Sequence, residues 1–228
     1  MNRLNLFRNP LNRWLGREEA RPTVPVKELR ERDRRRMVRH FLLLEGRDRV
    51  LRFGSLLSDE QVTKYVAGID FKRDMVFGVY NRMFRLVAVG HLAFAPREPA
   101  KEGVTAKARV AEFGVSVLKS ARGLGIGSKL FERAGIVCRN NDVDTLYMHC
   151  LSSNQVMMHI AKKAGMAIER EHGEADAYLK LLPADPSSVM REAMQEQLAT
   201  LDYALKANVR RATKLWERLP RRKKPDNS

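Results

Sequence analysis

One stretch, residues 109–131, constrains what this chain can fold into more than any other part of its sequence. It begins with β-branched and aromatic residues, which predict a strand from Val110 to Leu118. Every second residue from Gly123 to Gly127 is glycine, and apolar residues at helical spacing follow. Glycines permit positive φ angles, and the N–H groups at a helix N-terminus attract anions. The stretch therefore predicts a strand, a loop and a helix arranged to hold a phosphate.

The charge of the chain indicates the kind of partner it attracts. The net charge is +16 over 228 residues, and Arg and Lys are dense near both ends. Such a field favours anionic partners: nucleic acid, acidic membrane lipid or a polyphosphate cofactor. The two cysteines, Cys138 and Cys150, show no metal-binding spacing and do not indicate a disulfide scaffold. We therefore expect a cytoplasmic protein without a metal site. No apolar run approaches the ~18 residues that a membrane span needs.

Changes in composition divide the chain into four predicted parts. Residues 1–22 are a basic N-terminal extension, which also fits a transit peptide or a membrane-surface helix. Residues 23–182 hold the alternating strand and helix patterns of a folded domain. Residues 187–219 are a long amphipathic helix, and residues 220–228 are a basic tail. The strands we expect are 23–27, 75–80, 84–94, 109–118, 145–151, 167–171 and 175–182, and the helices are 26–44, 59–67, 126–139 and 153–164.

The long helix has an apolar seam. Its members recur in alternating steps of three and four, with an asparagine at one position: Leu198, Leu201, Leu205, Asn208, Ala212, Leu215 and Leu219. The seam is compatible with a helix that packs on its own domain and equally with a homodimer or a partner coiled coil. Contact with a membrane surface through Trp216 and the basic tail is a third interpretation.

Two motifs make the middle of the chain resemble the GNAT superfamily of acyl-CoA-dependent N-acetyltransferases. Residues 122–127, Arg-Gly-Leu-Gly-Ile-Gly, fit the family's pyrophosphate loop, Q/R-x-x-G-x-G/A. Asn154 opens a predicted helix that ends in Lys163-Ala164-Gly165-Met166, similar to the family's N-x-x-A-x-x-L-Y-x-K-x-G-F. A dinucleotide-binding fold would need G-x-G-x-x-G, whereas these glycines alternate as G-x-G-x-G. The resemblance covers about residues 23–182.

The resemblance implies an α/β (α+β) fold with a mixed central sheet of six to seven strands flanked by helices, to which the long C-terminal helix is added. It also implies acetyl-CoA as co-substrate. Main-chain N–H groups of the loop would bind the pyrophosphate, the strand before it would pair with the pantetheine arm, and Asn154 would bond that arm. The implied cofactor-binding residues are Val115, Val117, Leu118, Arg122, Gly123, Leu124, Gly125, Ile126, Gly127, Ser128 and Asn154.

Glu112 is the candidate catalytic base. An amine at neutral pH is mostly protonated, so a base must take its proton before it attacks a thioester. Protein-acetylating members of the family that resemble this chain place a catalytic glutamate at this point of the strand. The period of two puts Glu112, Gly114 and Ser116 on one face, where we expect the carboxylate to be half-buried. The alternative is a surface glutamate paired with an arginine.

The chain departs from the family pattern at Ala161, where many members have a tyrosine that protonates the leaving thiolate. Tyr147, His149 and Cys150, on the next predicted strand, are candidate substitutes. Residues 51–76 resemble bacterial protein-lysine acetyltransferases. The expected function is therefore acetyl transfer to a protein lysine, a polyamine or a small amine. The alternative is a CoA-binding sensor or scaffold that acts on nucleic acid, membrane or a partner protein through its basic ends.

Overall fold

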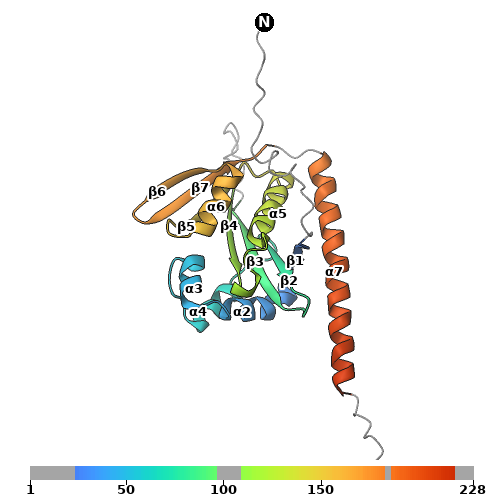
Figure 1. The fold of residues 1–228 in the computed structure, drawn as a ribbon. Helices are drawn as coiled ribbons and strands as arrows, with labels where there is room; N and C mark the ends of the chain where they lie inside the picture. Colours follow the sequence, from blue (N-terminus) through green and yellow to red (C-terminus); the bar gives the residue numbers. More distant parts are fainter. Residues whose placement is uncertain (1–23, 97–108, 183–185, 219–228) are drawn as a thin grey trace, which may run out of the picture.

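A seven-stranded mixed sheet, in the order β1-β2-β3-β4-β5-β7-β6, organises the fold (Figure 1). This computed structural model describes residues 24–96, 109–182 and 186–218. Neighbouring strands are antiparallel except β4 and β5, which are parallel. The strands are β1 (Lys27–Leu29), β2 (Met75–Tyr80), β3 (Leu86–Phe94), β4 (Val110–Val117), β5 (Thr145–Leu151), β6 (Ala167–Glu171) and β7 (Glu174–Lys180). The predicted mixed sheet is confirmed.

Helices cover both faces of the sheet and create two cores. The α-helices are α2 (Arg34–Leu42), α3 (Gly46–Phe53), α4 (Asp59–Ala67), α5 (Ile126–Asn140), α6 (Gln155–Ala164) and α7 (Pro186–Arg218), and two short 3-10 turns are η1 (Glu31–Asp33) and η2 (Lys119–Ala121). Phe131 of α5 packs against Phe113 of β4 in one core, which α6 extends. Phe41 of α2 and Val62 of α4 belong to the core on the other face.

The start of the domain corrects one sequence prediction. The predicted helix over residues 26–44 begins only at Arg34, because residues 27–29 pair with β2 as a strand and bury Leu29. The carboxylate of Asp33 accepts a hydrogen bond from the N–H of Arg30, which stabilises the turn before the helix. The predicted start of α4 is confirmed, since Ser58 and Gln61 form a reciprocal capping box. Helix α3 was not predicted.

Helix α7, the predicted long C-terminal helix, stands beside the sheet at its β1 edge (Figure 1). Arg133 of α5, which is 2% exposed, donates to the carbonyl oxygen of Glu192 at 3.0 Å and forms an ion pair with Glu196 at 3.4 Å. Tyr203 packs edge-on against Tyr80. The polar face of the helix therefore makes the contact with its own domain.

The apolar seam of α7 consequently points outward. Leu198, Leu201 and Leu205 are 58%, 63% and 67% exposed. The side chains of Ala212 and Leu215 and the predictions for residues 1–22, Leu219 and 220–228 lie outside what the structure describes. Among the described helices, none has the length and apolar character needed to cross a membrane.

Candidate functional site

Strands β4 and β5 separate part-way along their length. They pair only from Val110 to Glu112 of β4, although β4 continues to Val117 and β5 to Leu151. On its other edge β4 stays paired with β3 as far as Val117. The second half of β4 therefore directs a row of main-chain groups at a gap that no strand of the described chain fills.

The hydrogen bonds of Leu118 show which residues face this gap. The Leu118 N–H donates to Val87 of β3 at 2.9 Å. Because alternate residues direct their main-chain groups to opposite neighbours, Val115 and Val117 direct theirs toward β5. The Leu118 carbonyl accepts from Ala121 at 2.8 Å, so both of its main-chain groups are engaged. Of the three strand residues that the sequence suggested as cofactor-binding, Leu118 thus has no main-chain group to offer in this conformation.

The glycine loop has the backbone conformation that an anion site needs. Gly123 and Gly125 have φ angles of +76° and +71°, and an added Cβ at either would meet nothing within 4 Å. These glycines are therefore needed for conformation and not for space. Gly125 is the N-cap of α5, so the N–H groups of Ile126 and the next two residues have no partner within the helix. They lie at the positive end of the helix dipole, with Leu124 67% exposed beside them.

Two predicted cofactor residues are held by α3 in this structure. Arg122 forms an ion pair with Asp48 at 2.6 Å, and its Nε donates to the carbonyl of Val117 at 3.2 Å. The buried Asn154 accepts from the N–H of Met157 as the cap of α6. Its Nδ2 donates to the carbonyl of Leu51 at 3.3 Å. Both side chains thus connect the walls of the gap to α3.

Glu112 lies at the point where the two strands separate. It is exposed, which corrects the expectation of a half-buried carboxylate. Among the described residues it has no ion-pair partner, so it does not form the surface pair with arginine that was the alternative. In the β4–β5 register it sits beside Tyr147.

Asp176 of β7 controls the two titratable groups next to Glu112. Its Oδ1 accepts from the Tyr147 hydroxyl at 2.6 Å and bonds Nδ1 of His149 at 2.8 Å. Burial and the hydrogen bond to Asp176 raise the pKa of Tyr147, which therefore keeps its proton at neutral pH. The hydrogen bond to Asp176 also raises the pKa of the His149 imidazole, and the same two bonds lower the pKa of Asp176.

The remaining substitute for the absent tyrosine does not join this group. Cys150 is buried on the opposite face of β5, and burial raises the pKa of its thiol. Ala161 is buried in the core at 1% exposure. Tyr147 and His149 are thus the candidates that share a sheet face with Glu112.

A network of four hydrogen-bonded side chains that the sequence did not indicate crosses the same face of the sheet. Nη2 of Arg52 donates to the Tyr65 hydroxyl at 2.7 Å, and that hydroxyl is 2.9 Å from Nδ1 of His91. Nε2 of His91 is 3.1 Å from the carboxylate of Asp74. Since a carboxylate accepts, His91 donates through Nε2 and accepts from Tyr65 through Nδ1. Its four members come from four separate segments, so no spacing in the sequence reveals it.

Burial and the charge of Arg52 lower the pKa of His91, against the opposing effect of Asp74. The imidazole is therefore neutral at pH 7, as the direction of its hydrogen bonds requires. The side chains of Asp74 and His91 are 4% and 12% exposed. The Asp74–His91 end of this hydrogen-bonded network is thus enclosed, and its members hold one another in place.

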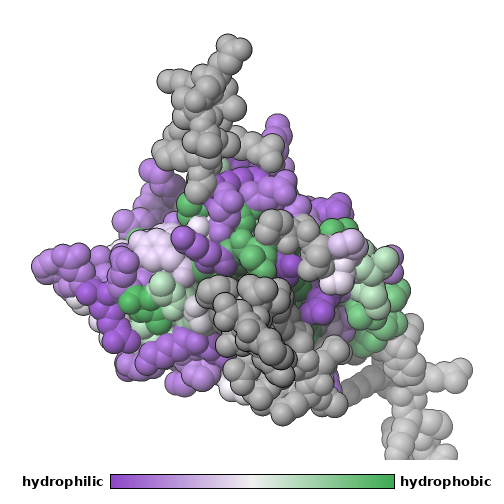
Figure 2. All heavy atoms as spheres, turned by 90° about the horizontal axis from the view of Figure 1, so that it is seen from above, coloured by the Kyte–Doolittle hydropathy of each residue, from purple (hydrophilic) through white to green (hydrophobic). Residues whose placement is uncertain are grey.

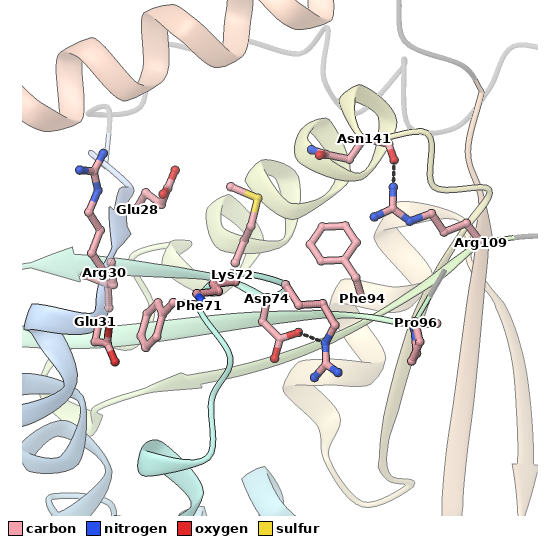
Figure 3. Close-up of a pocket in the computed structure, with 14 residues that line it drawn as sticks. Glu28, Arg30, Glu31, Phe71, Lys72, Asp74, Phe94, Pro96, Arg109 and Asn141 are labelled. Carbon is pink, nitrogen blue, oxygen red and sulfur yellow. Dashed lines mark hydrogen bonds and ion pairs between the residues drawn. The ribbon is translucent and has the colours of Figure 1, made fainter. Parts of the chain in front are cut away.

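A cavity of about 880 Å³ lies at the other end of the sheet, away from the glycine loop (Figure 3). Basic and acidic side chains mix in its wall: Arg30, Lys72, Arg73 and Arg109 with Glu28, Glu31 and Asp74. Asp74 forms an ion pair with Arg73 there at 2.9 Å. None of the predicted cofactor residues lines the cavity. We therefore place the candidate site at the β4–β5 gap, where the main-chain donors are.

Comparison with known proteins agrees with this geometry. Residues 84–166 match the acetyltransferase (GNAT) family. This match assigns residues 84–166 to a GNAT acetyltransferase domain. The family prediction is confirmed, and the matched residues span β4, the glycine loop, β5 and α6. No curated protein sequence matches the chain.

Solved structures support the fold. The GNAT domain of PAT from S. lividans is 21% identical, with a TM-score of 0.54, over 68% of this chain and 89% of that domain. An N-acetyltransferase from Staphylococcus aureus Mu50 is 14% identical, with a TM-score of 0.52, over 69% of this chain and 98% of that protein. Both likenesses concern the GNAT fold.

Proposed function

We propose that this GNAT domain transfers an acetyl group from acetyl-CoA to an amine, with Glu112 as the general base. The observation that carries the proposal is the gap between β4 and β5, which opens beside Glu112 and ends at the glycine loop. The main-chain groups of Val115 and the N–H of Val117 face this gap and are suited to the amide-bearing arm of CoA, as one strand pairs with another, whereas the Val117 carbonyl accepts from Arg122. The helix N-terminus at Ile126 suits its pyrophosphate.

The position of Glu112 supports its role as base. It is exposed on the face where an acceptor can approach from solvent, and it lies where the paired part of β4 ends. There it can take the proton that an amine must lose before it attacks the thioester carbon. Tyr147, which lies beside Glu112 on the same face of the sheet, is our candidate to protonate the departing thiolate.

The test is release of free CoA thiol from acetyl-CoA with a panel of amines. Glu112→Gln should lower kcat on the order of 100-fold, because positioned acid–base groups contribute about that much or more. Glu169→Gln, an exposed glutamate on β6, is the matched control and should leave turnover unchanged. Equal turnover by the unaltered protein and Glu112→Gln would remove Glu112 as the base.

The competing function is a CoA-binding sensor or scaffold. Calorimetry separates it from the enzyme, because a sensor binds CoA tightly yet transfers acetyl to none of the amines. A role on nucleic acid or anionic membrane through the basic ends predicts binding that weakens steeply as salt increases. Removal of residues 1–22 and 220–228 should then abolish that binding and leave acetyl transfer in place.

We further propose that α7 joins two copies of this chain. Large apolar side chains are 53–67% exposed along one face of the helix: Val189, Met190, Met194, Leu198, Leu201, Leu205 and Val209. Figure 2 shows hydrophobic residues gathered at the right-hand side, where α7 lies. Each of these seven side chains exposes roughly 100 Å². If two such helices cover one another, they together bury on the order of 1,400 Å², within the range of a stable interface.

The polarity of this face favours a second copy over a membrane surface. Every exposed residue of α7 from Val189 to Val209 is uncharged, whereas the charged residues of that segment are half-buried toward the domain. Helices that bind anionic membranes carry Lys and Arg beside the apolar face. An uncharged apolar face instead suits packing against an identical helix.

Light scattering at rising protein concentration tests this assembly. We expect a dimer that salt strengthens, because the net charge of +16 on each copy is then screened. Leu201→Glu with Leu205→Glu should give a monomer, whereas Met83→Glu, at an equally exposed site elsewhere, should not. A monomer at every concentration contradicts the proposal, as does binding to lipid vesicles that the double variant loses.

A further inference from the structure

Among the described residues, Arg52 of α3 is a half-buried charge without a counter-ion. Its guanidinium lies 5.0 Å, 5.5 Å and 5.9 Å from the ring centroids of Phe53, Tyr65 and Phe41. Nη2 is used by the Tyr65 hydroxyl, while Nε is buried without a hydrogen bond. Within the described residues no Asp or Glu forms an ion pair with it. Charges in such surroundings are ordinarily paired, because desolvating an unpaired charge is costly.

The guanidinium of Arg52 lies directly against β4, the strand that carries Glu112. A Cβ added to Gly114 would lie 2.8 Å from both Cζ and Nη1 of Arg52, so this approach requires glycine. Gly114 and Glu112 are successive residues on one face of β4, and the strand rise separates them by about 7 Å. An acceptor that lies along this face of β4 with its amine at Glu112 therefore places a group about 7 Å from that amine beside Arg52.

The groups around Arg52 leave room for one added negative charge. His40 and His91 are its titratable neighbours on α2 and β3, and burial together with the Arg52 charge lowers the pKa of both. Neither imidazole is an anion, and Asp74 is reached only through His91 and Tyr65. The half-buried state of Arg52 and Tyr65 leaves this site open to a ligand.

We propose that Arg52 binds a carboxylate of the acceptor, so that the preferred acceptor is an amine that carries a carboxylate within several ångströms of the reacting nitrogen. This inference rests on the proposed acetyl transfer. The planar guanidinium matches a carboxylate better than an ammonium group does. The net charge of +16 also favours an anionic acceptor over a polyamine. Two sources share this chemistry: a free amino acid and a peptide with an acidic residue beside its lysine.

Matched acceptors test the inference and separate the two sources. Lysine is compared with lysinamide, and a peptide with Asp beside its lysine is compared with the same peptide carrying Asn. For each pair we measure the ratio of kcat/KM for the carboxylate to that for the amide. We expect a ratio of roughly tenfold or more in at least one pair, expressed mainly in KM. The pair that shows it identifies the source of the carboxylate.

The same ratio of kcat/KM values is measured for variants of Arg52, because it does not depend on how much of a preparation is folded. In Arg52→Gln the ratio should fall to near one, and Arg52→Lys should keep part of it. Arg47→Gln, an exposed arginine on the same helix, should keep all of it. A ratio near one in the unaltered protein, or an undiminished ratio in Arg52→Gln, overturns the inference alone. Absence of transfer to every amine overturns the proposed function as well.

Discussion

The two faces of β4 differ in the kind of side chain they present. On one face Phe113 is 1% exposed and packs edge-on against Phe131 of α5, with ring centroids 5.6 Å apart. On the other face Ser116 meets His40, Gly114 meets Arg52, and Glu112 is exposed. The first face buries apolar surface only, and the second brings together charged and hydrogen-bonding groups.

The difference teaches how one strand supplies both stability and chemistry. Close packing on the α5 side holds the strand in place, so that the opposite face can leave a charge partly open and a carboxylate exposed. Substitutions on the first face should therefore change the free energy of unfolding, and substitutions on the second should chiefly change titration and turnover.

The largest effect is expected at Phe113. Phe113→Ala should lower the free energy of unfolding by about 3–5 kcal/mol, because it leaves a cavity between β4 and α5. Glu112→Gln, the adjacent residue on the other face, should change it by less than ~0.5 kcal/mol. Chemical denaturation measures both, and similar losses in the two variants would abolish the distinction between the faces.

His40 should make the second face sensitive to acid. It is 1% exposed, and since the carbonyl of Leu86 can only accept, Nδ1 donates to it and Nε2 accepts from Ser116. Burial lowers its pKa from 6.5 to about 4. Between these values the unfolded chain binds a proton that the folded protein does not, so stability falls as pH drops from 6.5 toward 4. The loss is about 3 kcal/mol.

Denaturation at pH 7 and pH 4.5 measures this loss. In His40→Asn the difference between the two pH values should be smaller by most of that amount, whatever the absolute stability of the variant. An unchanged pH dependence would show that His40 does not cause it.

Two glycine substitutions compare the glycine loop with an ordinary helix end. Gly125→Ala puts a side chain at φ +71°, which costs about 1–2 kcal/mol, and should weaken CoA binding several-fold. Gly68→Ala, at the C-cap of α4 with φ −79°, carries no such strain and should leave CoA binding unchanged. Denaturation and calorimetry with CoA test the pair; equal CoA affinity in both variants would contradict the role of the loop conformation.

The smallest effect is expected at Asp176. Asp176→Asn should lower the pKa values of Tyr147 and His149, which NMR titration measures directly. The raised pKa of His149 stabilises the fold below 6.5 and ceases to do so as pH rises through its folded value. The lowered pKa of Asp176 contributes above 3.8 and ceases to do so as pH falls through its folded value.

Unaltered protein and Asp176→Asn should therefore differ in stability most between those two folded pKa values, where both charges are present, by less than ~1 kcal/mol for such an exposed pair. Above the folded pKa of His149 the hydrogen bond from Tyr147 to Asp176 remains. The carboxylate of Glu174 is 3.7 Å from His149, and Glu174→Gln should change the pKa of that imidazole less than Asp176→Asn does. An equal shift in both variants would contradict the dominant role of Asp176.

Local pattern was enough to predict most elements and the family. Two runs of apolar residues joined by a short polar turn predicted the hairpin β2–β3, and the glycines predicted the loop before α5. Sequence reasoning failed at residues 26–33, where pairing with β2 prevails over helix propensity, and at α3, a short and highly charged helix. It also placed Glu112 in a half-buried setting, because exposure depends on which helix covers the strand.

The sequence by itself determined the family, the glycine loop before α5 and the side of β4 on which Glu112 lies, because each depends on residues close together in the chain. Only the tertiary structure decided where β4 and β5 separate, which face of α7 meets solvent, and that Arg52 of an unpredicted helix rests on Gly114. These features depend on contacts between residues dozens of positions apart. Such contacts leave no periodic signal, since the packing of whole elements fixes them.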